Sequence, residues 1–281
     1  MIAGATFGEL ELSDAHFHQI SEWVRTLCGI NLHLGKKELV KARLSKRVRQ
    51  LELPSFGRYL ELVRSQPGGP EMKAMLDALS TNLTSFFRED KHFEYLKNVV
   101  LSGLMAQEGQ ERRIRVWSAG CSSGEEPYSI AMVLAATLPQ TPAWDIRILA
   151  TDLSTRVLQL ARQGVYDERK VQTVPGQYRQ RFMELVQVRP SRQYRIVEQL
   201  RQRVHFSRLN LLDNWPMRGP IDVIFCRNVM IYFDKPTQAQ LVERFWKLLS
   251  PGGTLVLGHS ESLAGVRHKF GYAQPTVYQK R

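Results

Sequence analysis

Val116-Trp-Ser-Ala-Gly-Cys-Ser-Ser-Gly-Glu-Glu-Pro-Tyr128 joins a strand pattern to a helix pattern. The run Arg113–Trp117 has the character of a strand, and a helical pattern extends from Pro127 to Leu138. The apolar residues of that pattern recur at the spacing of one buried helix face: Ile130, Val133, Leu134 and Leu138. A strand, a turn of small residues and a helix begin a doubly wound α/β domain, in which ligands bind at the carboxyl ends of the strands. The stretch therefore predicts both a fold class and the place of a site.

The turn also indicates which ligand it would accept. Gly120 and Gly124 allow a sharp turn and a close approach of the backbone to a ligand. Their spacing is not that of a dinucleotide-binding motif, and no lysine follows as in a P-loop. Glu125 and Glu126 would repel a diphosphate at the helix N-terminus, so the pattern favours a ligand that carries positive charge, such as S-adenosylmethionine. A simpler interpretation is that both acids only favour the helix dipole.

Composition is that of an ordinary soluble globular protein. The 281 residues are 43% hydrophobic and have room for one large and one small domain. No apolar stretch approaches the ~20 residues of a membrane-spanning helix, and the first residues lack a signal-peptide pattern. Cys28, Cys121 and Cys226 lie far apart, which argues against disulfides or a zinc site. We expect a cytoplasmic protein with no metal and no insertion into a membrane, and no coiled-coil pattern indicates more than a monomer.

The formal net charge of +12 needs an explanation. A basic chain is typical of proteins that bind nucleic acid. It is equally typical of proteins that are attracted to an acidic protein surface. Charge alone does not separate these two classes of partner.

Residues 1–80 have the pattern of a small all-helical domain. Ser13 is expected to cap a first helix that ends at Gly29. A basic second helix is expected from Lys36 to Leu51, and shorter ones over Phe56–Val63 and Met72–Leu79. The second helix has three basic residues that are expected to face outward: Arg43, Lys46 and Arg49. A solvated helix face is the common alternative to a binding surface for such a run of charge.

The remaining chain is expected to be an α/β domain, 93–281, reached through a linker, 81–92. Strands and helices alternate as a mostly parallel, doubly wound sheet requires. The alternation is interrupted over 165–203, where two period-two runs predict a small antiparallel β insertion. Phe86 and Phe87 are unusual in a bare linker, and they are expected to pack either into the core or against a ligand.

Polar residues are expected at the ends of several strands. Asp152 follows the second strand, where an acid can accept hydrogen bonds from both hydroxyls of a ribose. It could instead cap the helix that begins near Ser154. The turn Asn210–Asp213 is placed to meet an adenine edge, and Arg227 and Asn228 follow the next buried strand.

Four segments in the right order resemble the CheR family, the glutamate methyltransferases of chemotaxis receptors. They are N-L-T-S-F-F-R from Asn82, W-S-A-G-C-S-S-G-E-E-P-Y-S from Trp117, F-C-R-N-V-M-I-Y-F-D from Phe225 and G-H-S-E-S from Gly258. The resemblance covers nearly the whole chain. It implies a fold of the S-adenosylmethionine-dependent methyltransferase type and transfer of the methyl group to receptor glutamates, with S-adenosylhomocysteine as product.

The resemblance also implies roles for particular residues. The residues it assigns to the cofactor are Asn82, Thr84, Arg88, Gly120, Glu125, Asp152, Asn210, Leu211, Arg227 and Asn228. Arg88 matches the residue suited to the cofactor's carboxylate, Glu125 the acid that holds its amino group, and Asp152 the ribose ligand. Arg88 and Tyr232 are expected to line the site of methyl transfer, and His259 is expected to have a structural role. The helical domain would recognise the receptor's methylation helices through Arg43, Lys46 and Arg49.

One departure from the family concerns receptor binding. Some members carry a glycine-bearing turn in the insertion that grips a tether peptide, and here no glycine lies between Gly176 and Gly219. We therefore expect no tether binding. Two other functions are less well supported by the sequence. A nucleic-acid methyltransferase is disfavoured because no aromatic platform follows the strand that ends at Cys226. A non-catalytic adaptor is disfavoured by Glu125 and Asp152.

Overall fold

A computed structural model describes residues 10–107, 111–141 and 143–281, which form two compact units. The first unit ends at Thr81, and the second runs from Asn82 to Arg281. The first residues, in which no signal peptide was expected, lie outside the described ranges. Among the described helices, none is both long enough and apolar enough to cross a bilayer.

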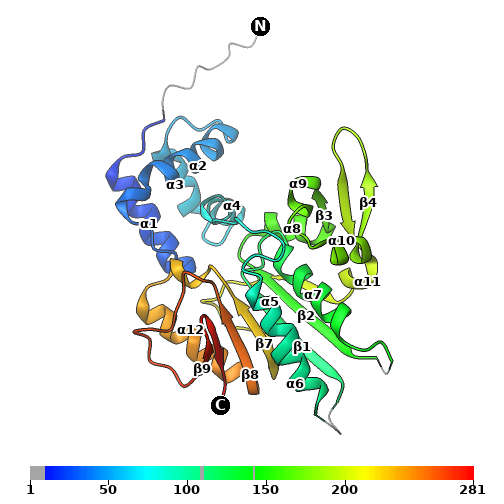
Figure 1. Cartoon of the computed structure of the whole chain (residues 1–281). Coiled ribbons are helices and arrows are strands. Elements are labelled where there is room, and N and C mark those ends of the chain that lie inside the picture. The colour runs from blue at the N-terminus through cyan, green and yellow to red at the C-terminus, as the bar shows by residue number, and fades with distance from the viewer. Residues whose placement is uncertain (1–9, 108–110, 142) are drawn as a thin grey trace. The chain divides into compact units, whose positions relative to one another are not determined.

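The first unit is a group of helices around one core (Figure 1). Its elements are α1 (Asp14–Cys28), the 3₁₀ turn η1 (Leu34–Lys36), α2 (Lys37–Gln50), α3 (Phe56–Ser65) and α4 (Pro70–Leu79). The predicted ends of α1 are confirmed: the Ser13 hydroxyl accepts a hydrogen bond from the His16 N–H, and Gly29 ends the helix with a left-handed φ of 76°. The core side of α2 presents Val40, Leu44 and Val48, which are all fully buried.

The basic residues of α2 divide into two kinds. Arg43 donates to the Leu79 carbonyl oxygen at 2.7 Å and to Ser80 and Thr81, so it caps the last turn of α4. Arg47 forms an ion pair with Glu71 of α4. The prediction that Arg43 faces outward is therefore wrong: the side chain is half-buried, because α4 leaves carbonyl groups that its guanidinium satisfies. Lys46 and Arg49 are exposed, as predicted.

The second unit contains a seven-stranded sheet in the order β6-β2-β1-β7-β8-β10-β9. Its strands are β1 (Arg113–Ala119), β2 (Asp145–Asp152), β6 (Val204–Arg208), β7 (Ile221–Cys226), β8 (Leu249–Leu257), β9 (Gly271–Gln274) and β10 (Val277–Gln279). The first five pair in parallel, and β10 pairs antiparallel with both β8 and β9. The strand β8 includes residues 251–253.

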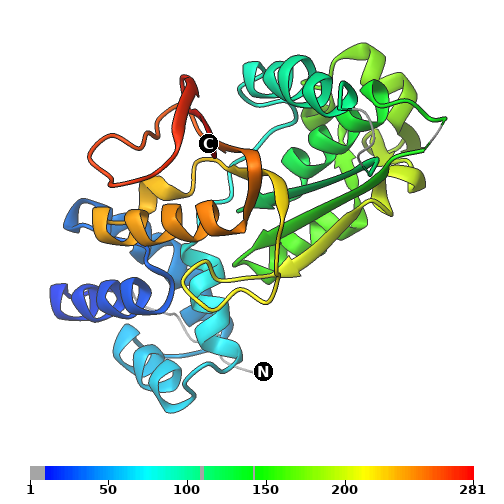
Figure 2. The same ribbon diagram turned by 90° about the horizontal axis from the view of Figure 1, so that it is seen from below.

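Helices cover both faces of this sheet (Figures 1 and 2). One core lies beneath α7 (Glu125–Thr137), α8 (Thr155–Gln163) and a helix of three segments. Those segments are α5 (Lys91–Tyr95), the π-helical η2 (Leu96–Leu101) and α6 (Ser102–Met105). The other core lies beneath α12 (Lys235–Leu248) and contains Trp117. The helix from Lys91 to Met105 was not predicted, although Phe93, Leu96 and Leu101 are buried on it.

The helix α7 is buried on every side from Glu125 to Leu134. The predicted face, with Ile130, Val133, Leu134 and Leu138, is buried, but the burial of the other faces was not predicted. The sheet covers one side of α7, the segments α5 and η2 another, and α10 and α11 of the insertion a third. A helix that is apolar all round belongs in such a layer.

The insertion is confirmed as a small antiparallel sheet with the order β3-β5-β4. Its elements are β3 (Val165–Asp167), α9 (Glu168–Val171), α10 (Gly176–Phe182), β4 (Met183–Gln187), β5 (Gln193–Ile196) and α11 (Glu198–Arg201). Phe86 packs edge-on to Tyr166, and Phe87 stacks on Tyr178 with ring centroids 4.9 Å apart. The two Phe residues thus pack the insertion against the main core. The sheets and helices together confirm the predicted fold class.

Candidate functional site

The carboxyl edge of the parallel sheet is where the chain reverses its order. The strand β1 lies between β2 and β7. The connection after β1 leads to β2 on one side, whereas the connection after β7 leads to β8 on the other side. Ligands of doubly wound sheets bind at this switch point. The turn after β1 has left-handed backbone at Gly120 (φ 87°), at Gly124 (φ 96°) and at Ser122 (φ 49°), which is not a glycine. A Cβ at Gly120 would lie 2.3 Å from Val229 Cγ2, so only glycine fits there.

Asp152 ends β2 beside that turn. Its Oδ2 accepts the Ser122 N–H at 2.8 Å, and its Oδ1 accepts the Ser154 N–H at 2.9 Å. Ser154, and not Asp152, is the N-cap of α8. The left-handed Ser122 thus aims a backbone donor at the carboxylate and fixes its orientation.

Asn82 meets the same turn from the start of the second unit. Its carbonyl oxygen accepts a hydrogen bond from the Ser122 hydroxyl at 2.8 Å. Its side-chain nitrogen Nδ2 is buried and has no hydrogen-bond partner. A buried donor of this kind is rare unless a ligand or water satisfies it.

Asn210 and Leu211 follow β6 on the other side of Asp152. The preceding Leu209 N–H donates to the Asp152 carbonyl oxygen at 3.0 Å. Asn210 Nδ2 donates to Asp213 Oδ1 at 3.0 Å, and the Leu211 carbonyl oxygen accepts from Arg244 and from Trp215. These contacts hold the turn in one conformation next to the acid.

Glu125, the first residue of α7, is fully buried. Its carboxylate accepts a hydrogen bond from the Ser123 hydroxyl at 2.7 Å and forms an ion pair with Lys170 of the insertion. The Lys170 side chain is 41% exposed. The carboxylate already holds one ammonium group, so a second cation would share it or displace Lys170.

Glu126 points into the protein, where it binds Arg227. The Arg227 guanidinium lies between two carboxylates, 3.1 Å from Glu126 Oε2 and 3.0 Å from Glu89 Oε2, and it also donates to the Arg88 carbonyl oxygen. Burial raises the pKa of the Glu126 carboxyl. The Arg227 charge and the Ser118 hydrogen bond oppose that rise. Burial alone would raise the pKa of Glu89 as well, but Arg227 and the His259 N–H hold it below its ordinary value. Sequence reasoning missed Glu89, since nothing local links it to a residue 138 positions away.

Arg88 lies between two residues with left-handed backbone, Phe87 (φ 52°) and Glu89 (φ 57°). Its Nη1 donates to the Leu83 carbonyl oxygen at 3.1 Å, and its side chain is 37% exposed. Thr84 is half-buried in the same segment. Strained backbone at non-glycine residues is common at ligand sites.

The segment after β7 is fastened by a buried acid. Glu261 accepts backbone N–H groups from Asn228 at 2.8 Å, Gly258 at 2.6 Å and Ile231 at 3.1 Å. Burial raises the pKa of the Glu261 carboxyl, and these backbone hydrogen bonds oppose that shift. Asn228 has a left-handed φ of 58°, and Tyr232 ends the short helix η3 (Met230–Tyr232). Glu261 was inside a recognised motif, yet its role could not be seen from the sequence because its partners are backbone groups of another loop.

Hydrogen bonds connect most of the predicted cofactor residues of the second unit. Asp152, Asn82 and the glycine turn meet at Ser122, while Arg88, Arg227 and Asn228 meet around Glu89 and Glu261. The residues fit a cofactor such as S-adenosylmethionine, because the edge offers ordered carboxylate oxygens and an unsatisfied amide donor. The edge has no lysine or arginine on the turn itself, as a diphosphate would require. Arg43, Lys46 and Arg49 belong to the first unit.

The fold and this site define an S-adenosylmethionine-dependent methyltransferase. Residues 82–279 match the CheR methyltransferase SAM binding domain, and residues 15–80 match the CheR methyltransferase all-alpha domain. The chain belongs to the CheR methyltransferase family.

Curated relatives support the same assignment over nearly the whole chain. A probable chemotaxis protein methyltransferase of Rhizobium etli is 42% identical over 252 residues, covering 89% of this chain and 94% of the relative. Chemotaxis protein methyltransferase 2 of Pseudomonas aeruginosa is 42% identical, covering 96% and 94%. The chemotaxis protein methyltransferase of Escherichia coli is 42% identical, covering 96% and 92%.

Proposed function

We propose that the protein transfers the methyl group of S-adenosylmethionine to glutamate side chains of chemoreceptors, giving methyl esters. The observation that carries this proposal is the ordered acidic edge around Asp152 in a chain that belongs to the CheR methyltransferase family. A nucleic-acid substrate is less well supported, because no aromatic platform follows the strand that ends at Cys226. In addition, Arg43 and Arg47 of the basic helix α2 are used inside the first unit.

Each residue of the site has a role in this proposal. Asp152 accepts the two ribose hydroxyls, and Asn82 Nδ2 finds in the cofactor the acceptor that it lacks in the protein. Glu125 holds the amino group in place of, or together with, Lys170, and Arg88 binds the carboxylate. Two further groups of residues complete the site. Asn210 and Leu211 lie along the adenine, and Thr84, Gly120, Arg227 and Asn228 shape the methionine end.

The reaction needs alignment more than acid–base chemistry. The bound cofactor supplies a methyl group on a sulfonium, which a carboxylate oxygen attacks in line. A glutamate side chain has a pKa of ~4.3, so the nucleophile is ionised at neutral pH and no general base is required. Arg88 and the Tyr232 hydroxyl position the attacking carboxylate, and the surrounding residues exclude water that would solvate it.

Receptor recognition is assigned to the basic face of α2. Methylation helices carry glutamates, and the exposed Lys46 and Arg49 have the complementary charge. Arg43 also contributes positive charge, although its guanidinium donates hydrogen bonds to the end of α4. The expectation that no tether peptide binds rests on the missing glycine alone. The strand β4 is an edge strand of the insertion. Leu185 and Val186 on β4, and Val188 just after it, are 40–59% exposed. That open edge is suited to strand addition and weighs against the expectation.

Labelled methyl transfer to receptor cytoplasmic fragments tests the proposal. We expect a base-labile ester that mass mapping places on glutamate, no transfer to RNA, and loss of transfer when the mapped glutamates are changed to alanine. Tyr232→Phe should lower turnover with little change in cofactor affinity, because only the hydroxyl is removed. A label on RNA, or a base-stable label on the receptor, would refute a glutamate ester.

A further inference from the structure

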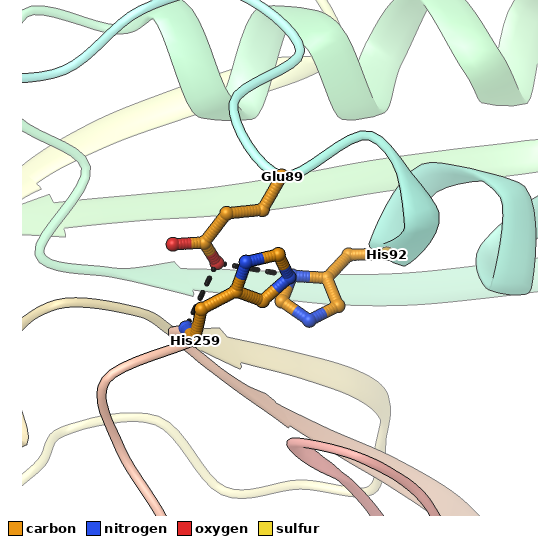
Figure 3. Close-up of side chains that lie close together, drawn as sticks. All are labelled: Glu89, His92 and His259. Atoms are coloured by element: carbon orange, nitrogen blue, oxygen red, sulfur yellow. Dashed lines mark hydrogen bonds and ion pairs between the residues drawn. The ribbon is translucent and has the colours of Figure 1, made fainter.

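A group of potential metal ligands includes Glu89, which forms an ion pair with Arg227. The group consists of Glu89, His92 and His259 (Figure 3). One potential ligand atom from each residue lies within 4.8 Å of the others. Glu89 and His92 come from the segment that leads into α5, and His259 follows β8. No local pattern connects these residues, because His259 is 170 residues from Glu89.

The protonation of His92 follows from its neighbours. Its Nε2 lies 2.7 Å from Thr276 Oγ1, whose hydroxyl proton is directed to the Pro275 carbonyl oxygen at 2.6 Å. The Thr276 oxygen therefore accepts the Nε2–H, and the lone pair of the ring is on Nδ1. A histidine whose outer N–H is held in this way is arranged as metal-binding histidines are.

The lone pair of His92 faces the cluster and has no partner. The His92 side chain is 1% exposed, and Nδ1 has no hydrogen bond. Its nearest charged neighbour is Glu89 Oε2 at 3.5 Å, which is also an acceptor. Two acceptors that face each other in a buried place are unfavourable unless a donor or a cation lies between them.

The geometry suits a small divalent ion. Ligand atoms about 2.0–2.1 Å from a tetrahedral zinc ion lie ~3.4 Å from one another, and the Glu89–His92 separation is 3.5 Å. The His259 ring packs edge-on against the His92 ring, with ring centroids 5.1 Å apart. Because His259 is exposed, its ring can turn toward the ion without disturbing the core. A fourth position then stays open for water. The neighbouring Arg227 does not exclude an ion, because Glu89 and Glu126 together outweigh its charge.

We propose that Glu89, His92 and His259 form a binding site for a divalent transition-metal ion of the zinc type. One imidazole nitrogen from each histidine and a carboxylate oxygen are a donor set that such ions accept. The ion would bind the Glu89 carboxylate, which also binds Arg227.

Calorimetric titration of Zn²⁺ into the chelator-treated full chain tests the site. We expect one equivalent to bind, and we expect His259→Ala to weaken binding by roughly 10–100-fold, as the loss of a metal-site residue does. His205→Ala is the matched control, since His205 is an exposed histidine on β6. His259→Ala should fold normally because its side chain is exposed, whereas the buried His92 is unsuitable as the first variant.

Co²⁺ in place of Zn²⁺ identifies the ligands. The three cysteines are buried, and a nitrogen–oxygen site gives ligand-field bands without the strong near-ultraviolet band of a thiolate. The proposal is overturned if the chain binds no Zn²⁺ at concentrations up to about a hundred micromolar, which corresponds to ~5.5 kcal/mol. It is equally overturned if binding is the same in His259→Ala, is lost in His205→Ala, or shows the thiolate band.

Discussion

The charged side chains of the helices α2 and α7 differ in their burial and in their partners. The acids that begin α7 are buried, and each is paired: Glu125 with Lys170 and Glu126 with Arg227. On α2 the cations Lys46 and Arg49 reach solvent, whereas Arg43 and Arg47 bind α4. A charge that is buried must be matched in place, and a charge at the surface is available for a partner. Similar runs of charge in a sequence can therefore stabilise the fold, bind a ligand or bind a partner protein.

The largest effect is expected where a buried pair is broken. Arg227→Ala leaves Glu126 and Glu89 without their shared cation, and such losses cost ~3–5 kcal/mol. The free energy of unfolding, measured by urea titration, should fall by that amount. Lys247→Ala, which removes the exposed partner of Glu243, serves as the control and should cause no measurable loss. Equal stability of the two variants would mean that the buried network contributes nothing.

A smaller effect separates the basic residues of α2 from each other. Arg43→Ala should lower the free energy of unfolding by about 1–3 kcal/mol, because the carbonyl groups at the end of α4 lose a charged donor. Lys46→Glu should leave stability nearly unchanged but weaken salt-sensitive binding of receptor fragments, since exposed charges act over ~8–10 Å at physiological salt. Parallel unfolding and binding titrations check both. If Lys46→Glu changes stability and spares binding, α2 is not the receptor surface.

The smallest effect concerns the cysteines, one in the first unit and two in the second. Burial raises the pKa of Cys28 to about 11, and burial also raises the pKa of Cys121 and Cys226. Since the thiolate is the reactive form, all three should resist iodoacetamide at pH 8 in the native protein and react after unfolding. Peptide mapping after labelling would show whether either unit unfolds locally under native conditions. Prompt alkylation of Cys28 alone would mean that the first unit unfolds locally.

The sequence predicted the parts of this structure that depend on local rules. The strand β1, the glycine turn and the Ser13 cap follow from period, glycine and side-chain chemistry within a few residues. Asp152 was found because the end of a strand next to such a turn is a known place for an acid. The burial of α7 on all sides was not predicted, because it depends on α10 and α11, which lie far away in the chain.

Residues with distant partners could not be assigned in advance. Glu89 binds Arg227, Arg43 binds the end of α4, and Glu261 binds the backbone of another loop. No spacing in the sequence encodes these pairs, because folding alone brings them together. The missed helix from Lys91 to Met105 is different: its apolar residues have a detectable helical period, and its π-helical middle only shifts that period.

We propose that the acidic edge of the sheet around Asp152 holds the cofactor. Calorimetry with S-adenosylhomocysteine on Asp152→Ala tests it most directly, with Asp145→Ala at the opposite end of β2 as the matched control. Loss of hydrogen bonds to a charged acceptor costs ~1.5–3 kcal/mol each, so affinity should fall roughly tenfold to a hundredfold in Asp152→Ala. Affinity in Asp145→Ala should be that of the unchanged protein. Unchanged affinity in a folded Asp152→Ala variant would contradict the account.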